Sequence, residues 1–173
     1  MNQPEAVMEA WQLGNEEAFE QIYTAFHGPL YSFIYRYTRD EPFSVDIVQD
    51  TFLRLQTNKH QYDPSKGALK SYLFQIAYRL MINKLNRRKK WRSLLPFLVP
   101  SQESSLHPAE KLTVQQAVSE LPDLQRAVIL LYYYHDLPQK EIAAILHIPL
   151  GTVKSRLHQA IQTLKTHLEV EDL

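Results

Sequence analysis

The 173-residue chain contains no cysteine, only four glycines, and no run of apolar residues long enough to span a membrane. The absence of cysteine excludes disulfides, thiolate metal sites and cysteine nucleophiles, and it suits a reducing compartment. The N-terminus has no basic segment followed by an apolar run. We therefore expect neither secretion nor membrane insertion, and we predict a cytoplasmic protein.

The chain also lacks net charge, because 19 basic side chains balance 19 acidic ones. The charges are nevertheless segregated along the sequence. Residues 1–69 carry a net charge of −5, and residues 70–92 carry +8 with no acidic residue. The blocks 93–124, 125–168 and 169–173 carry −3, +3 and −3. Since salt screens charge over about 8 Å, a partner interacts with the block that it contacts and not with the neutral total.

Long apolar patterns with a period of 3.6 residues predict an all-α protein. We expect two small helical domains, residues 1–91 and 109–173, joined by a flexible linker at 92–108 that is rich in proline and serine. The linker also contains a short apolar run. This run either packs on one of the domains or lies in a groove of a partner, and the sequence leaves both open.

Turn signals divide the N-terminal domain into four predicted helices. Asn15 is the expected N-cap of the first helix, and Gly28-Pro29 is expected to end that helix before the second one begins. Ser44 is expected to cap the third helix. We expect Val45, Val48, Phe52 and Leu55 to be buried on the third helix, and Leu73, Ile76, Ala77 and Leu80 on the fourth. The predicted helices cover 15–27, a segment from Leu30, a segment after Ser44, and 68–90, with a loop at 59–67 before the last.

Helices are expected in the C-terminal domain at 109–120, 122–135, 139–146 and about 150–168. The last two are joined by His147-Ile148-Pro149, which predicts a helix-turn-helix. The polar face of the last helix has no acidic residue, and Arg and Gln can read base edges while Lys, Ser and Thr contact phosphates. An ordinary helical hairpin with a solvated face is the alternative, and the combined pattern favours DNA binding.

Three segments resemble parts of the extracytoplasmic-function (ECF) RNA polymerase sigma factors of the sigma-70 superfamily. The segment 148–157 resembles their −35-reading domain, and 46–55 resembles their helix for docking on core polymerase. The segment 71–79, leading to Asn86-Arg87-Arg88, resembles their −10-reading and melting helix. Two positions depart from the family pattern. His147 stands where a turn glycine is usual, and Val45 stands where the docking helix often has a second acidic residue.

The resemblance implies a sigma factor that binds core RNA polymerase, at the clamp coiled coil and the flap, and directs promoter-specific initiation without being an enzyme. Core polymerase, promoter DNA and an anti-sigma factor are the expected partners, and no cofactor or metal is expected. Docking is expected of Asp46, Gln49, Asp50 and Arg54. Recognition of the −35 element is expected of Thr152, Lys154, Ser155, Arg156 and Gln159. Recognition and melting of the −10 element are expected of His60, Tyr62, Asp63, Ser65, Lys66, Gln75, Arg79, Asn83, Arg87 and Arg88.

Several alternatives stand beside these assignments. The rings of Tyr72, Phe74 and Tyr78 either stack on bases or belong to the core, which is the commoner use of aromatic residues on a long helix. The basic run at 87–90 could be a solubilising helix end. A stand-alone helix-turn-helix regulator would leave the docking and basic helices unexplained, and a helical protein adaptor would leave every polar face as plain surface. Enzyme classes lack support, since the seven histidines show no metal-ligand spacing and no phosphate-binding glycine loop occurs.

Overall fold

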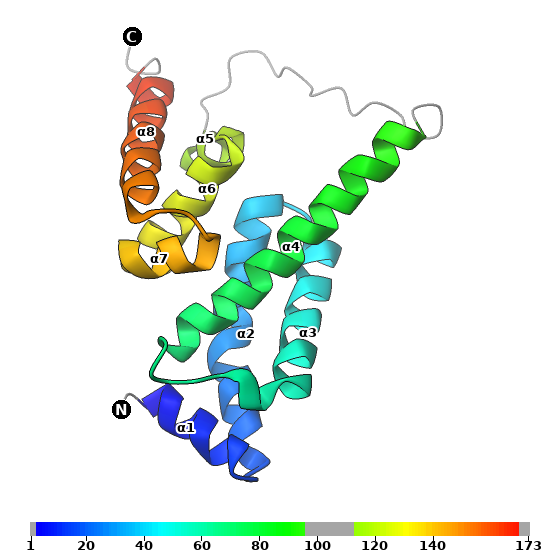
Figure 1. Ribbon diagram of the computed structural model, residues 1–173. Helices are drawn as coiled ribbons and strands as arrows, with labels where there is room; N and C mark the ends of the chain where they lie inside the picture. Colours follow the sequence, from blue (N-terminus) through cyan, green and yellow to red (C-terminus); the bar gives the residue numbers. More distant parts are fainter. Residues whose placement is uncertain (1–2, 96–112, 170–173) are drawn as a thin grey trace.

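The computed structural model describes residues 3–95 and 113–169, and every regular element in these ranges is helical (Figure 1). None of these helices is long and apolar enough to cross a membrane. Most of the expected linker, residues 96–108, lies outside the described ranges. The N-terminal helices are α1 (Gln3–Gln12), α2 (Glu17–Thr38), α3 (Glu41–Thr57), the 3-10 turn η1 (Lys59–Gln61) and α4 (Leu69–Leu94). The C-terminal elements are α5 (Val114–Glu120), α6 (Asp123–Ile129), the π-helical turn η2 (Leu130–Tyr134), α7 (Gln139–Leu146) and α8 (Leu150–Glu169).

The predicted break at Gly28-Pro29 is wrong, because α2 runs through both residues. Pro29 cannot donate a hydrogen bond to the carbonyl of Ala25, but Ala25 is exposed, so water can satisfy that carbonyl. The buried face continues unbroken from Ile22 past the proline to Tyr37. The packing of this face outweighs the local penalty. The N-cap of α2 is Glu16 and not the predicted Asn15, although the Asn15 side chain accepts a hydrogen bond from the backbone N–H of Glu17 at 3.2 Å.

The predicted cap of α3 is also wrong. Asp40 is the N-cap, and its carboxylate accepts a hydrogen bond from the backbone N–H of Phe43 at 3.0 Å. Ser44 lies inside the helix, fully buried, and donates to the backbone carbonyl of Asp40. With the helix starting earlier, Ile47 and Thr51 share the buried face, while Val45 is 41% exposed.

The first part of α4 packs in the core, and its last part projects into solvent. Its buried residues are Leu69, Leu73, Phe74, Ala77 and Met81, whereas the predicted core residues Ile76 and Leu80 are only half-buried. From residue 86 to its end the helix is exposed, and it extends past the expected boundary at 91 to Leu94 (Figure 1). The basic block of the sequence therefore lies mostly on the part of α4 that reaches into solvent.

The helices α7 and α8 form the predicted helix-turn-helix. His147 ends α7 in the left-handed region, with φ of 54° and ψ of 46°, and its N–H bonds the carbonyl of Ala143. Histidine is among the non-glycine residues that tolerate this region, so the turn forms without glycine. Ile142, Val153 and Leu157 are buried between the two helices and their neighbours, as the periodicity predicts.

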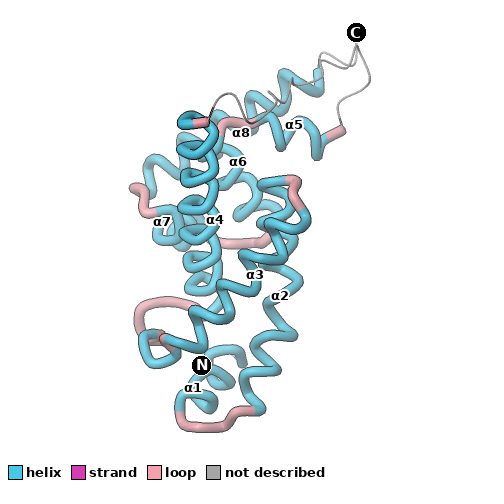
Figure 2. Tube along the Cα trace, turned by 90° about the vertical axis from the view of Figure 1, so that its right-hand side faces the viewer, coloured by secondary structure: helices cyan, strands magenta, loops and turns pink. Residues whose placement is uncertain are grey.

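The N-terminal and C-terminal helices share one continuous hydrophobic core. The views from the front and from the side agree that α7 lies along α4 (Figure 1, Figure 2). At the centre of this junction the buried ring of His135, which follows η2, packs against Phe33 of α2 and Phe74 of α4, with ring centroids 5.8 Å and 4.9 Å away. The two parts of the chain are packed together through apolar and aromatic side chains.

His135 is expected to make the folded protein sensitive to acid. Burial, with smaller effects from the charges of Lys70 and Arg36 and an opposing one from Asp136, lowers its pKa to about 4. The unfolded chain, with an ordinary histidine pKa, therefore binds more protons as pH falls from about 6.5 to 4. The free energy of unfolding should drop by up to about 3 kcal/mol across this window, in addition to the contributions of other groups.

We expect His135→Phe to flatten this dependence, because phenylalanine fills the aromatic site without a titrating group and removes a buried Nε2 that has no hydrogen-bond partner. Urea unfolding at several pH values between 4 and 7 measures the effect, with the same change at the exposed His158 as a control. Equal pH slopes for the His135→Phe variant and the unmodified protein would contradict the prediction.

Candidate nucleic-acid interface

The first half of α8 presents the polar face predicted to enter a DNA groove. Lys154, Ser155 and Gln159 are exposed, and Thr152 and Arg156 are half-buried beside them. The Arg156 guanidinium donates to the side-chain oxygen of Gln159 at 2.9 Å. This bond holds two side chains with base-reading chemistry next to one another, and no acidic side chain interrupts the face. The buried residues Val153, Leu157 and Ala160 fix the opposite side of the helix on the domain.

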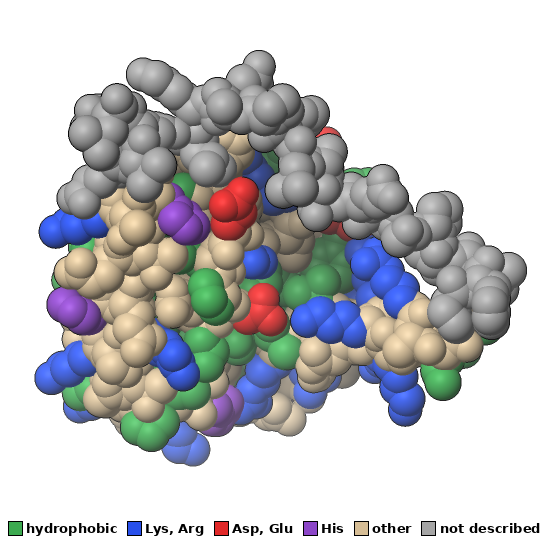
Figure 3. Space-filling model, turned by 90° about the horizontal axis from the view of Figure 1, so that it is seen from above, with side chains coloured by type: hydrophobic (Ala, Val, Ile, Leu, Met, Phe, Trp, Pro, Cys, Tyr) green, Lys and Arg blue, Asp and Glu red, His purple; other side chains and the backbone are tan. Residues whose placement is uncertain are grey.

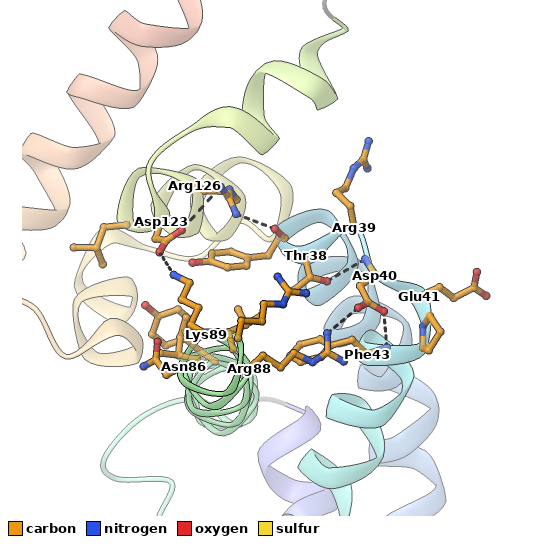
Figure 4. A pocket seen from close by; sticks show the side chains of 17 residues that line it. Thr38, Arg39, Asp40, Glu41, Phe43, Asn86, Arg88, Lys89, Asp123 and Arg126 are labelled. Carbon is orange, nitrogen blue, oxygen red and sulfur yellow. Dashed lines mark hydrogen bonds and ion pairs between the residues drawn. The ribbon is translucent and has the colours of Figure 1, made fainter. Parts of the chain in front are cut away.

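The projecting end of α4 carries the second candidate surface. Asn83 and Arg87 are exposed, and Figure 3 shows Lys and Arg side chains around the projecting arm. Arg88 differs from Arg87. Figure 4 shows the Arg88 side chain directed toward Asp40 and Phe43. It forms an ion pair of 2.9 Å with Asp40, and its guanidinium carbon lies 4.5 Å from the centre of the Phe43 ring. In this structure Arg88 joins α4 to the start of α3, whereas Arg87 projects into solvent.

Two hydrogen bonds lower the pKa of the Asp40 carboxyl below its usual value. The backbone N–H of Phe43 has the larger effect and the Arg88 guanidinium the smaller one. Asp40 is thus held as a carboxylate that both caps α3 and anchors Arg88.

The loop before α4 contains side chains that hold it together and side chains that are exposed, among them Lys66, whose Nζ lies 3.7 Å from the Asp63 carboxylate. Tyr62 is buried, packs 5.3 Å from the ring of Tyr72, and donates its hydroxyl to the carbonyl of Gly67 at 3.0 Å. Burial raises the pKa of Tyr62 to about 12. Asp63 accepts hydrogen bonds from the backbone and hydroxyl of Ser65 at 2.9 and 2.7 Å. These contacts shape the loop, while the side chains of His60 and Lys66 are exposed on it.

The remaining predicted −10 residues, Gln75 and Arg79, meet the C-terminal helices. The side-chain amide of Gln75 donates to the carbonyl of Ala144 at 3.2 Å, and the Arg79 guanidinium contacts the ring of His147. No local pattern predicts this contact, because the residues involved are 68 to 72 positions apart. The first half of the polar stripe of α4 therefore contacts the C-terminal part of the chain, with Gln75 half-buried and Arg79 still exposed.

The exposed side of α3 carries the residues predicted to dock on polymerase. Asp46, Gln49, Asp50 and Arg54 are all exposed on this helix. Lys84 of α4 lies 3.6 Å from the carboxylate of Asp46 and 4.0 Å from that of Asp50. Val45 and Leu53, which are 41% and 61% exposed, add apolar surface to the same helix. Acidic and apolar groups side by side are suited to a protein partner.

A cavity of about 770 Å³ lies where the start of α3, the end of α4 and α6 meet (Figure 4). Across it, Lys89 lies 3.8 Å from the carboxylate of Asp123, and the Arg126 guanidinium donates to the carbonyls of Tyr37 and Leu121 at 3.1 and 2.9 Å. These residues join the two parts of the chain. Among the residues that the structure describes, no group of three His, Asp or Glu side chains could hold a metal ion.

An all-helical chain with a helix-turn-helix and a separate basic helix defines a class of nucleic-acid-binding proteins. Comparison with known proteins narrows this class. The family model for Sigma-70 region 2 matches residues 22–92, and that for Sigma-70, region 4 matches residues 111–164. The ECF RNA polymerase sigma factor SigM of Bacillus subtilis is 33% identical over 152 residues, which cover 84% of this chain and 92% of SigM. SigW of the same organism is 28% identical over 171 residues, covering 90% and 91%.

Solved structures show the same fold. The sigma factor RpoE in complex with the anti-sigma factor NepR from Bartonella quintana matches with a TM-score of 0.74 at 23% identity, covering 88% of this chain and 97% of that one. CnrH in complex with the cytosolic domain of CnrY matches with a TM-score of 0.75 at 22% identity, covering 98% and 99%. The chain belongs to the ECF RNA polymerase sigma factors. It is a factor for promoter-specific transcription initiation.

Proposed function

We propose that this sigma factor binds core RNA polymerase and the two promoter elements through three separate surfaces. The exposed face of α3 docks on core RNA polymerase, the loop at 60–66 with the polar stripe of α4 binds the −10 element, and the polar face of α8 reads the −35 element. The observation that carries the proposal is the exposed α8 face without an acidic residue, in the same chain as an exposed basic end of α4.

In this mechanism the protein supplies recognition and the polymerase supplies catalysis. Helix α8 lies in the major groove, where Arg156 and Gln159 contact base edges and Lys154 contacts phosphate. Arg79, Asn83 and Arg87 follow the backbone of the opened strand, and the loop before α4 holds an unstacked base. No step requires a cofactor or metal, and the protein acts in the cytoplasm together with the polymerase. An anti-sigma factor is the proposed regulator, supported by the solved relatives that carry one.

Run-off transcription with purified core polymerase tests this function. Templates are selected from a random promoter library by binding to the reconstituted holoenzyme. The proposal expects transcripts that start at one position and depend on the added chain. If the chain neither binds core polymerase nor produces such transcripts, the proposed function is wrong.

Arg156→Ala should weaken binding of the holoenzyme to its selected −35 element by about 5- to 100-fold, the range for a base-reading arginine. Affinity for core polymerase should not change, because Arg156 lies on a different surface from α3. Filter binding to duplexes with and without the −35 element measures the first quantity, and fluorescence anisotropy with labelled core measures the second. Lys165→Ala, at an exposed site nearer the end of α8, serves as the matched control. A parallel loss of core affinity would contradict the separation of the two surfaces.

A further inference from the structure

The projecting end of α4 carries an exposed tryptophan among basic side chains. Trp91 is 63% exposed, and so is Leu94. Arg87 lies one turn before Trp91, and Lys90 lies one turn before Leu94; both basic side chains are exposed. Because residues three or four apart share a side of a helix, these four residues form one surface. We call this surface the tip face of α4.

The opposite side of this helix end is held by the rest of the molecule. Arg88 forms its 2.9 Å ion pair with Asp40, and Lys89 lies 3.8 Å from the carboxylate of Asp123. Within residues 3–95 and 113–169, by contrast, the two cations of the tip face form no ion pair. The sequence also has no acidic residue between positions 70 and 92. The tip face is therefore a cationic surface that suits an anionic partner.

The place of Trp91 on α4 indicates where such a partner would lie. The polar stripe of this helix advances by four residues through Asn83 and Arg87, and Trp91 is the next position at that spacing. It lies about 12 Å beyond Asn83 along the helix axis, the length of about three or four base pairs. This end of α4 is also the end from which the chain continues to the helix-turn-helix. The tip face therefore lies on the −35 side of the proposed −10 surface, where the promoter is still double-stranded.

The side chains of the tip face have the chemistry of a major-groove contact. An α-helix fits this groove, where apolar side chains contact the C5-methyl group of thymine and cations bind the phosphates at the groove edges. The indole ring of Trp91 offers a large apolar surface, and its N–H can donate to a phosphate or a base acceptor. Arg87 and Lys90 lie beside it and supply the positive charge.

An anionic lipid surface is the other partner that combines tryptophan with basic residues, and the distribution of charge on α4 argues against it. A helix that lies on a bilayer buries a broad apolar side and keeps its cations on the opposite side. Residues 87–90 are all basic, and since successive residues turn by about 100°, they surround the helix. Two of these cations belong to the tip face itself. Duplex DNA fits this arrangement better, because it binds cations and an apolar ring on the same side of a helix.

We propose that the tip face lies in the major groove of the duplex directly upstream of the −10 element, and that Trp91 recognises a thymine there through its C5-methyl group. Arg87 and Lys90 bind phosphates of the same groove. This inference rests on the proposed function, because that function places the preceding part of α4 on the −10 element. Trp91 then determines sequence preference at a base pair outside both promoter elements.

Selection of promoters by variant holoenzymes tests this inference. Core polymerase with the unmodified chain, Trp91→Ala or Trp91→Phe selects binding sites from a library of random duplexes. The unmodified chain should enrich thymine at one position within about four base pairs upstream of the −10 element. Trp91→Ala should lose this preference and still select the −10 and −35 elements, whereas Trp91→Phe should keep it, because the aromatic ring is retained. Leu13→Ala removes another exposed apolar side chain, 83% exposed and far from α4 in the sequence, and is the matched control.

Deoxyuridine, which lacks the C5-methyl group, tests the contact at the level of one methyl. Replacing the enriched thymine by deoxyuridine should weaken binding of the unmodified holoenzyme by about three- to five-fold, the usual effect of one buried methyl group. The same replacement should leave the affinity of the Trp91→Ala holoenzyme unchanged. Filter binding measures both, and circular dichroism checks that the variant is folded. An equal loss for the two holoenzymes would overturn the role of Trp91.

The same selection separates this inference from the proposed function. Enrichment of −10 and −35 elements without a preference upstream of the −10 element would overturn the inference and leave the function intact. If no common sequence is selected by any of the chains, both are wrong. Trp11 is only 3% exposed, so a shift in intrinsic fluorescence on adding vesicles reports on Trp91. A blue shift with vesicles of phosphatidylglycerol and phosphatidylethanolamine, together with no thymine preference, would assign the tip face to lipid and overturn the inference.

Discussion

Phe74→Ala should lower the free energy of unfolding by about 3–5 kcal/mol, the usual cost of removing a buried phenylalanine ring. Phe74 is fully buried, with Phe33 of α2 at 5.6 Å and His135 at 4.9 Å between ring centroids. The cavity would open where the two parts of the chain meet, so both parts should lose stability together. At about 2–4 °C for each kcal/mol, the melting temperature should fall by about 10 °C.

Thermal and urea unfolding followed by circular dichroism measure this effect. Tyr133→Ala is the matched control, because it removes an aromatic ring that is 56% exposed, and we expect it to cost under about 1 kcal/mol. Similar losses for the two variants would show that the junction is not a packed core. Two separate unfolding transitions in the unmodified protein would show the same.

Reversing the two acidic charges on α3 should have the largest effect on function. Asp46→Lys with Asp50→Lys is expected to reduce affinity for core polymerase by about 100-fold, or about 2.7 kcal/mol, if both carboxylates face basic groups of the partner. Lys84, which lies within 4.0 Å of each carboxylate, would then add a third positive charge to the altered face. Promoter-specific transcription at limiting core should fall accordingly.

Glu9→Lys with Glu20→Lys is the matched control, since it makes the same change in net charge at exposed positions of α1 and α2. Fluorescence anisotropy with labelled core polymerase measures both double variants, and circular dichroism checks that each is folded. Equal losses for the two pairs would mean that overall charge, and not the α3 face, determines the affinity.

Local sequence patterns correctly predict the turn at His147 but wrongly predict a helix break at Gly28-Pro29. The turn at His147 forms as predicted, because its geometry depends on the two helices beside it and on the conformations that histidine tolerates. The predicted break at Gly28-Pro29 is wrong because the local penalty of proline is real but is exceeded by the packing of α2. The apolar face that outweighs this penalty is completed by residues distant in the sequence.

In the candidate site, too, local patterns predict some features and tertiary packing decides others. The polar face of α8 and the exposure of Asp46, Gln49, Asp50 and Arg54 on α3 follow from helical periodicity, which assigns one face to the core and leaves the other to solvent. Periodicity could not predict that Tyr62 would be buried under its own loop, or that Arg88 would pair with Asp40, 48 residues away. Such pairings depend on how helices cross, which no local pattern records.

The sequence by itself determined the all-helical class, the helix-turn-helix and the segregation of charge, because each is a property of neighbouring residues. Only the tertiary structure decided how the charged blocks meet. Asp46 and Asp50 lie beside Lys84, and Lys89 lies beside Asp123, so the basic helix is partly neutralised by acidic residues from both flanking blocks. The tertiary structure also decided that α7 rests on α4, since that contact depends on apolar side chains from α2, α4 and the segment after η2 burying one another.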